Sequence, residues 1–429
     1  MSRTPTPMTT DDEYESDTQS VGSVDSLWGN EPESVDFKDG WQDEMLETVD
    51  ALGDRKGSSM RGREELLKSF VRVASLKVVT EDMLAARGED LVGILGRMVK
   101  GGRSMKEVSL AARALSLLAA STPELNSLSI SILPLLQQTI SHGQTDLAPA
   151  ALIHAMASIA FFSPTLTSID IYPIIDFYAE IIQSKGHSIG EDEEDEAIAA
   201  SIEGLAILLG VLETPLEKLK SVLPILVNAL SSSSLAVRLA AGETIALAYE
   251  LAAPPSESDE DYEAESTEPL IYDDIDQLTS LLASLSTAST KKMSKNSRRE
   301  QHSHFRDILR TVASNQPLPT QKIRFATRQE LQLDSWEKLL RLKHLRRIFT
   351  HGLHVHLAAN TYVRQVLDLP PPSEPASVGS SDDDEGMTTA ERRTFQKEVR
   401  RLRQGRVRRD RRRAGEGRMI DVFGAEEYE

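Results

Sequence analysis

The chain has 429 residues, of which 40% are hydrophobic, a formal net charge of −19 and no cysteine. A chain of this length can bury a large core and is normally divided into two or three units. The lack of cysteine excludes disulfide bridges, thiolate zinc sites and cysteine nucleophiles. The charge is unevenly spread, because residues 1–290 carry about −29 and residues 291–418 about +14. A polyanion beside the second part would respond to this local charge, since exposed charges are screened beyond ~8 Å.

The first 50 residues contain fourteen acidic side chains and only two basic ones, Arg3 and Lys38. They lack the basic start and the apolar stretch of a signal peptide, and no apolar run in the chain reaches the ~20 residues of a membrane span. We therefore expect a protein of the cytoplasm, or also of the nucleus, that does not bind membranes. Residues 1–39, with few large apolar side chains, are predicted to be a disordered acidic tail.

A helical pattern repeats along residues 40–285. An apolar residue is followed at i+3 by a small residue, at i+4 by an apolar or small residue and at i+7 by another apolar residue, which places all four on one helix face. The copies lie 39 to 46 residues apart, the period of armadillo and HEAT repeats, and they span Leu66–Val73, Val108–Leu115, Leu152–Ile159, Ile198–Leu205 and Val237–Thr244. The sequence therefore predicts an all-α fold, an armadillo/HEAT-like α-solenoid with acidic loops at 186–196 and 254–268. These loops are either solvated or sites for a basic partner.

The remaining residues divide by composition. We predict a basic linker at 286–300, a small helical C-terminal module at 301–369, a disordered acidic linker at 370–387, a basic helix at 388–418 and an acidic tail at 419–429. In the module we expect helices at Phe305–Val312, Asp334–His351 and Val355–Leu367, and an extended stretch at Lys322–Phe325. Asp334 or Ser335 can cap the second helix, and Gly352 can supply a left-handed exit from it.

The module contains three blocks of residues that resemble the C-terminal domain of the interferon-related developmental regulator family. The blocks contain Phe305, Arg306, Asp307, Ile308 and Leu309, then Ser335 and Trp336, and then Gly352, His356, Asn360 and Arg364. The resemblance implies an armadillo-like N-terminal domain and a non-enzymatic regulator. It further implies association with translationally inactive ribosomes, whose RNA and proteins the solenoid and module would contact while a basic C-terminal helix enters the mRNA path. Members are also described as transcriptional co-regulators.

The basic segment at 388–418 is the sharpest chemical signal. Between Glu391 and Arg418 there are thirteen Lys and Arg residues and four acids, and arginine binds phosphate oxygens through two parallel hydrogen bonds. The RNA-binding residues that we predict here are Arg392, Arg393, Lys397, Arg400, Arg401, Arg403, Arg406, Arg408, Arg409, Arg411, Arg412 and Arg413. The alternatives are a nuclear import signal or a solvated charged helix. Arg324, Arg346 and Arg347 are predicted to add phosphate contacts, although they can equally serve solubility.

No residues are assigned to catalysis, metal binding or a cofactor. The chain has no nucleophile elbow, no phosphate-binding glycine loop and no dinucleotide fingerprint. His351, His354 and His356 lack the spacing of a helical zinc site. Asp307 is predicted to be a cap or the ion-pair partner of Arg306 or Arg310.

Two hypotheses for function follow. The first is a non-enzymatic regulator of translation that binds the ribosome and its RNA, with further protein partners on the solenoid and no small-molecule substrate. The second is a nuclear transcriptional co-regulator that uses the solenoid groove for proteins and the basic segment for import. In both cases we expect a monomer when the protein is unbound.

Overall fold

The structure, a computed structural model, describes residues 40–54, 59–84, 87–142, 148–190, 195–253, 272–287, 295–326 and 329–372. All of them belong to one unit that ends at Pro372. The predicted segments at 1–39, 254–268, 388–418 and 419–429 lie outside the described residues, as do most of the predicted linker at 370–387 and every tail arginine named above.

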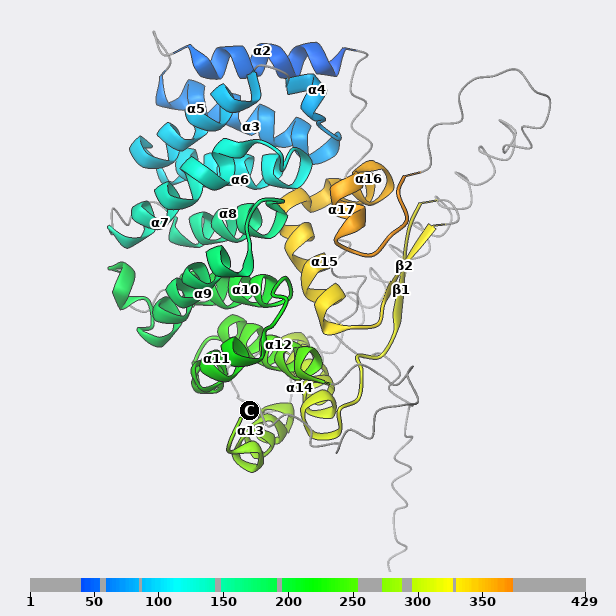
Figure 1. Cartoon of the computed structure of the whole chain (residues 1–429). Helices are drawn as coiled ribbons and strands as arrows, with labels where there is room; N and C mark the ends of the chain where they lie inside the picture. The colour runs from blue at the N-terminus through cyan, green and yellow to red at the C-terminus, as the bar shows by residue number, and fades with distance from the viewer. Residues whose placement is uncertain are drawn as a thin grey trace, which may run out of the picture. The chain divides into compact units, whose positions relative to one another are not determined.

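The described chain is a stack of helix pairs (Figure 1). The pairs are α2 (Trp41–Gly53) with α3 (Met60–Leu76), α5 (Gly88–Gly101) with α6 (Met105–Ser121), α7 (Leu133–Ser141) with α8 (Pro149–Phe162), α9 (Ser168–Gln183) with α10 (Asp195–Leu209), α11 (Leu216–Ala229) with α12 (Leu235–Ala252), and α13 (Ile275–Thr287) with α14 (Lys295–Ser314). Short turns α4 (Glu81–Leu84), η2 (Leu128–Ile132) and η3 (His187–Ile189) connect some of them. The second helices of the pairs, α3, α6, α8, α10, α12 and α14, pack on one another and form what we call the inner layer.

The repeated sequence pattern lies on the inner layer. Its small residues Ala111, Ala155 and Ser201 are buried, which lets neighbouring helices approach closely. Gly204 of α10 is under the same constraint, since a Cβ there would lie 2.9 Å from the ring of Tyr178. The predicted all-α solenoid is confirmed.

The predicted boundary between linker and module at 301 falls inside a helix. Helix α14 begins at Lys295, inside the expected linker, and packs on α12 and α13 as the last inner-layer helix of the stack. It carries a further copy of the pattern in which Gln301 and His304 occupy the first two positions and are buried beside Phe305 and Ile308. Sequence reasoning missed this copy because polar residues stand where apolar and small ones were expected.

A two-stranded hairpin follows the stack, so the C-terminal module is not wholly helical. Strand β1 (Gln321–Ala326), which contains the predicted extended stretch, pairs antiparallel with β2 (Gln329–Leu333). Ile323, Leu331 and Leu333 are its buried side chains. The second strand was not predicted.

The module ends in helices α15 (Trp336–Phe349), α16 (Leu353–Ala359) and α17 (Thr361–Gln365), with a 3-10 turn η4 (Thr350–Gly352) after α15. Ser335 caps α15, since its hydroxyl accepts a hydrogen bond from the Lys338 amide at 3.2 Å. The single helix expected at Val355–Leu367 is instead two, because the Asn360 side chain accepts from the amides of Tyr362 and Val363 and starts a new helix. Among the described helices, none is long and apolar enough to cross a membrane.

Candidate functional site

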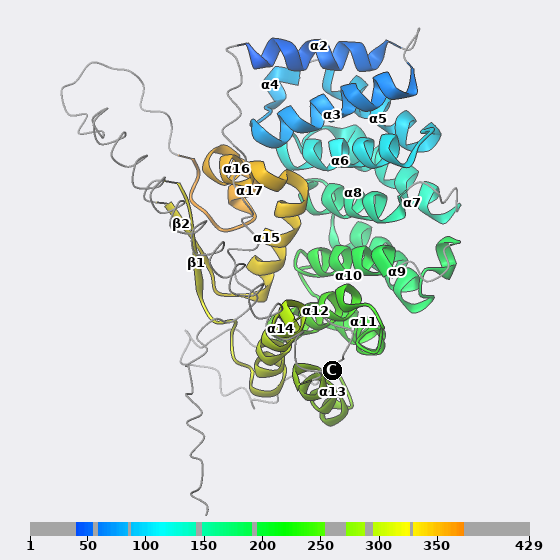
Figure 2. The same ribbon diagram turned by 180° about the vertical axis from the view of Figure 1, so that it is seen from behind.

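The motif residues of the module lie where α14–α17 meet the solenoid. Helix α15 crosses the inner layer on the side away from α7, α9 and α11, as both ribbon views show (Figures 1 and 2). It contacts α3, α6, α10 and α12, helices that are far apart in the sequence. The solenoid thus presents part of its inner layer to its own chain, which reduces the groove open to the protein partners of the second hypothesis.

Glu250 of α12 holds the start of α15. Its carboxylate accepts hydrogen bonds from the backbone amides of Trp336 at 2.8 Å and Glu337 at 3.0 Å. Amides in the first turn of a helix lack partners within the helix and attract negative charge. The indole of Trp336 is buried and donates to the Thr311 hydroxyl of α14 at 2.9 Å, so Trp336 joins three helices.

Glu243 of α12 forms the second contact and is almost fully buried. His304 of α14 lies 2.9 Å from its carboxylate, and Lys343 of α15 forms an ion pair with the same oxygen. Burial alone would raise the pKa of Glu243, but the charge of Lys343 and the hydrogen bond with His304 outweigh it and lower the pKa to about 2. Glu243 therefore remains charged at neutral pH and links three helices.

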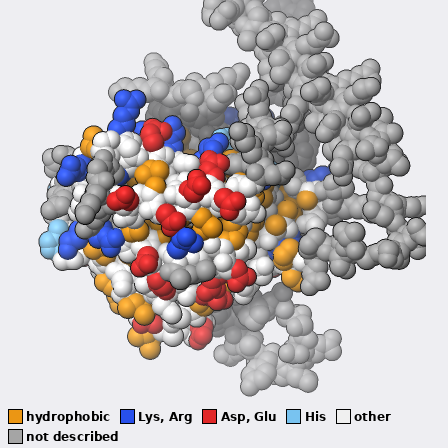
Figure 3. Space-filling view, turned by 90° about the horizontal axis from the view of Figure 1, so that it is seen from above, with side chains coloured by type: hydrophobic (Ala, Val, Ile, Leu, Met, Phe, Trp, Pro, Cys, Tyr) orange, Lys and Arg blue, Asp and Glu red, His pale blue; other side chains and the backbone are white. Residues whose placement is uncertain are grey.

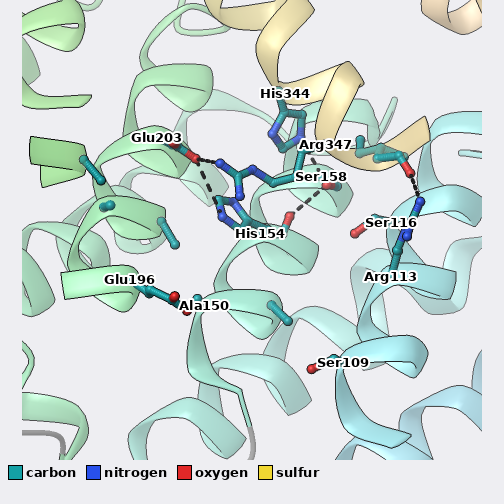
Figure 4. A pocket seen from close by; sticks show the side chains of 15 residues that line it. Ser109, Arg113, Ser116, Ala150, His154, Ser158, Glu196, Glu203, His344 and Arg347 are labelled. Atoms are coloured by element: carbon teal, nitrogen blue, oxygen red, sulfur yellow. Dashed lines mark hydrogen bonds and ion pairs between the residues drawn. The ribbon is translucent and has the colours of Figure 1, made fainter. Parts of the chain in front are cut away.

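Beside this cluster lies a pocket of about 490 Å³ between α6, α8, α10, α12 and α15 (Figure 4). Its wall contains small residues from the first halves of the inner-layer helices, namely Ser109, Ala150, Ala151, Ala199, Ala200 and Ala236. Glu203 of α10 points toward Arg347 of α15, which it pairs with at 2.5 Å, and toward His154, at 3.7 Å (Figure 4). Burial raises the pKa of Glu203, and Arg347 opposes this.

The histidines of this pocket are held neutral. Burial and the nearby Arg347 lower the pKa of His154 well below its usual range and that of His344 to about 3. His344 lies 3.1 Å from the Ser158 hydroxyl of α8. The His344 imidazole is thus a contact between α15 and α8, whereas the buried Nδ1 of His154 has no hydrogen-bond partner among the described residues.

Arg113 of α6 reaches the end of α15. It donates to the Thr350 hydroxyl at 3.0 Å and, at 3.5 Å, to the carbonyl of Ile348. Burial lowers the pKa of the guanidinium. Arg113 therefore satisfies a carbonyl that the helix end leaves without an intrahelical partner.

The third motif block packs on α3 and α6. His356, whose pKa burial lowers to about 3, stacks on Phe349 and lies 3.1 Å from the Ser75 carbonyl of α3. The Asn360 side chain donates to the Ala120 carbonyl of α6 at 3.0 Å. Both side chains thereby contact buried carbonyls in the last turns of solenoid helices, where carbonyls lack intrahelical partners.

Gly352 does not supply the predicted left-handed exit. Its φ is −84°, and Thr350 has the positive φ of 48° instead. Gly352 is required for a different reason, since a Cβ there would lie 1.7 Å from the Ser75 carbonyl oxygen. The module backbone touches the solenoid backbone at this point.

The remaining motif residues are structural within the module and α14. Arg364 is buried and donates to the carbonyls of Leu357 and Pro370 and to the Gln329 side chain. In α14, Phe305 and Ile308 are buried against Gly242 of α12, whereas Leu309 is half-buried and Arg306 exposed. Asp307 forms the predicted ion pair with Arg310, at 3.3 Å.

The predicted RNA-binding residues in the described part are not clustered. Arg324, on β1, is exposed and pairs with Glu330 at 3.1 Å. Arg346 donates to the Thr350 carbonyl, and Arg347 pairs with Glu203 while remaining half-exposed. Each therefore has a partner within the chain, and their contact with RNA stays a prediction.

Sequence reasoning missed the glutamates that receive the module. Glu203, Glu243 and Glu250 are in α10 and α12, whose other inward-facing residues are apolar or small. A single carboxylate within an apolar helix face predicts a contact with another element. An unpaired buried charge is costly, so a cation from elsewhere in the fold must pair with it. The sequence does not say which cation that is.

The family profile described as Interferon-related developmental regulator (IFRD) matches residues 8–313, which end beside the last residue of α14. The chain is 27% identical to Interferon-related developmental regulator 1 of Mus musculus over 354 residues, 80% of this chain and 75% of that protein. It is 27% identical to Interferon-related developmental regulator 2 of Mus musculus over 366 residues, 82% and 78% of the two chains. An uncharacterized protein of Schizosaccharomyces pombe is 26% identical over 383 residues, 84% and 82%. The chain therefore belongs to the interferon-related developmental regulator family.

Proposed function

We propose that this protein is a non-enzymatic regulator of translation that binds the ribosome and its RNA. Membership of a regulator family supports the class. The observation that carries the proposal is the arginine-rich segment at 388–418, with thirteen Lys and Arg residues against four acids from Glu391 to Arg418. Such a segment neutralises phosphates and releases their counterions.

The solenoid and module would act as the rigid body that carries this segment. The ion pairs of Glu203 and Glu243, the Glu250 cap and the contacts of Gly352 and Asn360 fasten the module to the stack. Arg364 holds the Pro370 carbonyl, two residues before the described unit ends. The linker predicted at 370–387 ties the basic segment to this body, so docking of the body would raise the effective concentration of the segment at nearby RNA.

Sedimentation through sucrose gradients tests the proposal. The wild-type protein should migrate with ribosomal particles at low salt, and its association should fall steeply as salt rises. Replacing Arg406, Arg408, Arg409, Arg411, Arg412 and Arg413 by Gln should move most of the protein to the top of the gradient. The proposal is wrong if this tail variant migrates with the particles as the wild type does.

The nuclear hypothesis predicts a different result with the same tail variant. If the segment is an import signal, the wild type accumulates in the nucleus and the tail variant does not, while sedimentation is unchanged. The nuclear hypothesis depends on the solenoid groove, part of which α15 occupies, whereas the main contact of the first hypothesis is made by the basic segment, and we therefore favour the first.

A further inference from the structure

The solenoid changes charge along its length. The described residues between 40 and 142 contain eleven Lys and Arg and thirteen Asp and Glu, whereas those between 148 and 253 contain four and ten. In the view from the α2 end, Lys and Arg side chains gather toward one edge, and Asp and Glu occupy the centre (Figure 3). The N-terminal repeats are therefore less acidic than the repeats that follow them, and a polyanion could approach them only where their basic side chains gather.

The positive charge is concentrated at the corner between α5 and α6. Arg97, Lys100, Arg103 and Lys106 follow one another at intervals of three residues, and no acid occurs from Leu91 to Lys106. All four side chains are exposed. Lys106 pairs with Glu64 at 3.2 Å, but the other three form no ion pair with any residue that the structure describes. Three adjacent cations thus remain available to an external anion.

A pocket of about 200 Å³ opens at this corner. Arg63, Arg97 and Arg103 line it together with two carboxylates, Asp54 and Glu107. Glu107 is buried and already paired, since it accepts from Arg63 at 2.6 Å and from the Arg103 amide at 3.1 Å. Arg63 is therefore engaged within the fold, and Arg97 and Arg103 supply the free guanidinium groups.

The chemistry of the pocket favours phosphate over a base or an apolar side chain. Guanidinium groups bind phosphate oxygens through two hydrogen bonds at once. No aromatic residue is among those that line the pocket, so bases have no platform on which to stack. Binding here should consequently depend on phosphate charge and not on base sequence.

We infer that Arg97, Lys100 and Arg103 form a second RNA-binding surface that contacts the phosphate backbone, distinct from the arginine-rich tail. This inference rests on the proposed function. It adds to it a surface of the solenoid that would bind the RNA. RNA held at this corner as well as by the tail would be bound at two places, which strengthens binding without new contacts at either.

The test uses the full chain and a fluorescently labelled RNA hairpin, with affinity measured by anisotropy over a range of salt. The corner variant R97Q/K100Q/R103Q should bind about tenfold more weakly at low salt and lower the slope of log K against log salt by about two to three. The control K68Q/K185Q/K220Q removes the same charge from exposed positions elsewhere and should bind as the wild type does. Equal urea midpoints for both variants show that the fold is intact.

Further variants separate this inference from the proposed function. In the tail variant, residual RNA binding should persist and should be lost when the corner substitutions are added. The variant R97K/R103K, which keeps the charge, should retain most of the salt slope, and hairpins of different sequence should bind alike. The inference is overturned if the corner variant binds as the control does. A corner effect without ribosome association in the gradients would overturn the proposed function alone.

Discussion

At Gly352 the backbone of the module touches the backbone of α3. No side chain fits there, because a Cβ would overlap the Ser75 carbonyl oxygen at 1.7 Å. The same carbonyl lies 3.1 Å from the ring nitrogen of His356. Gly352 and His356 therefore both contact the C-terminal end of α3. Even an added methyl group at Gly352 must push the two backbones apart.

We predict that Gly352→Ala lowers the free energy of unfolding by about 3 kcal/mol, the upper range for overpacking an interior contact. Urea denaturation followed by circular dichroism measures this. The matched control is Gly101→Ala at the end of α5, where a Cβ would meet nothing within 4 Å. Equal midpoints for the two variants would show that the module does not press on α3 as described.

At the scale of elements, α15 is attached to the stack by polar contacts as well as by its buried apolar side chains. Lys343 and Arg347, four residues apart and therefore on one face of α15, pair with Glu243 of α12 and Glu203 of α10. Glu250, seven residues after Glu243 on α12, accepts the amides at the start of α15. The helix is therefore positioned by charge pairing as well as by its buried leucines.

The cluster at Glu243 should be costly to break. Glu243→Gln leaves Lys343 and His304 without their carboxylate, and we expect a loss of about 3 kcal/mol in the free energy of unfolding. Adding Lys343→Met should recover part of that loss, since the uncompensated cation is then removed. Chemical denaturation of the two single variants and the double variant measures the coupling. The exposed Glu213→Gln serves as the control, and a coupling of zero would contradict the cluster.

At the scale of the whole molecule, one helix connects repeats that would otherwise touch only their neighbours. Solenoid repeats normally depend on adjacent repeats alone, but α15 contacts α3 and α12, and η4 and α16 return to α3. The module therefore couples the two ends of the stack. Its interface buries three histidines, His154, His344 and His356, in neutral form.

These histidines predict the pH dependence of stability. Their pKa values in the folded state lie well below the ordinary 6.5, at about 3 for His344 and His356. Below pH 6.5 the unfolded chain gains protons that the folded chain does not, so stability falls as the pH drops from 6.5 toward 3. His344 and His356 should each cost about 2 kcal/mol at pH 5 relative to neutral pH. Glu203 and Glu250, whose pKa values burial raises, act in the opposite sense.

The variant His344→Gln isolates one of these contributions. Glutamine can replace the hydrogen bond to Ser158 and does not titrate. Between pH 7 and pH 4 the unfolding free energy of the variant should therefore fall less steeply than that of the wild type. The difference in slope should correspond to at most one proton taken up on unfolding. The exposed His142→Gln is the control. A pH profile identical to that of the wild type would show that His344 is not held neutral in the fold.

The sequence by itself determined the solenoid, because its helices show the same spacing of apolar and small residues five times before α14. It also determined the charge of the segment at 388–418 and the identity of the motif residues. It did not show that α14 is the last helix of the stack. Gln301 and His304 can be buried in α14 only because Arg238 donates a hydrogen bond to Gln301 and Glu243 forms one with His304. Polar residues enter a core only when distant partners satisfy them.

Only the tertiary structure decided what the motif residues do. Gly352, His356 and Asn360 meet carbonyls of α3 and α6 that lie about 240 to 280 residues earlier in the chain, and no local pattern encodes such contacts. The pairing of α15 with Glu203, Glu243 and Glu250 was decided in the same way. Periodicity reports which face of a helix is buried, whereas the identity of the opposing face depends on how the whole chain folds back.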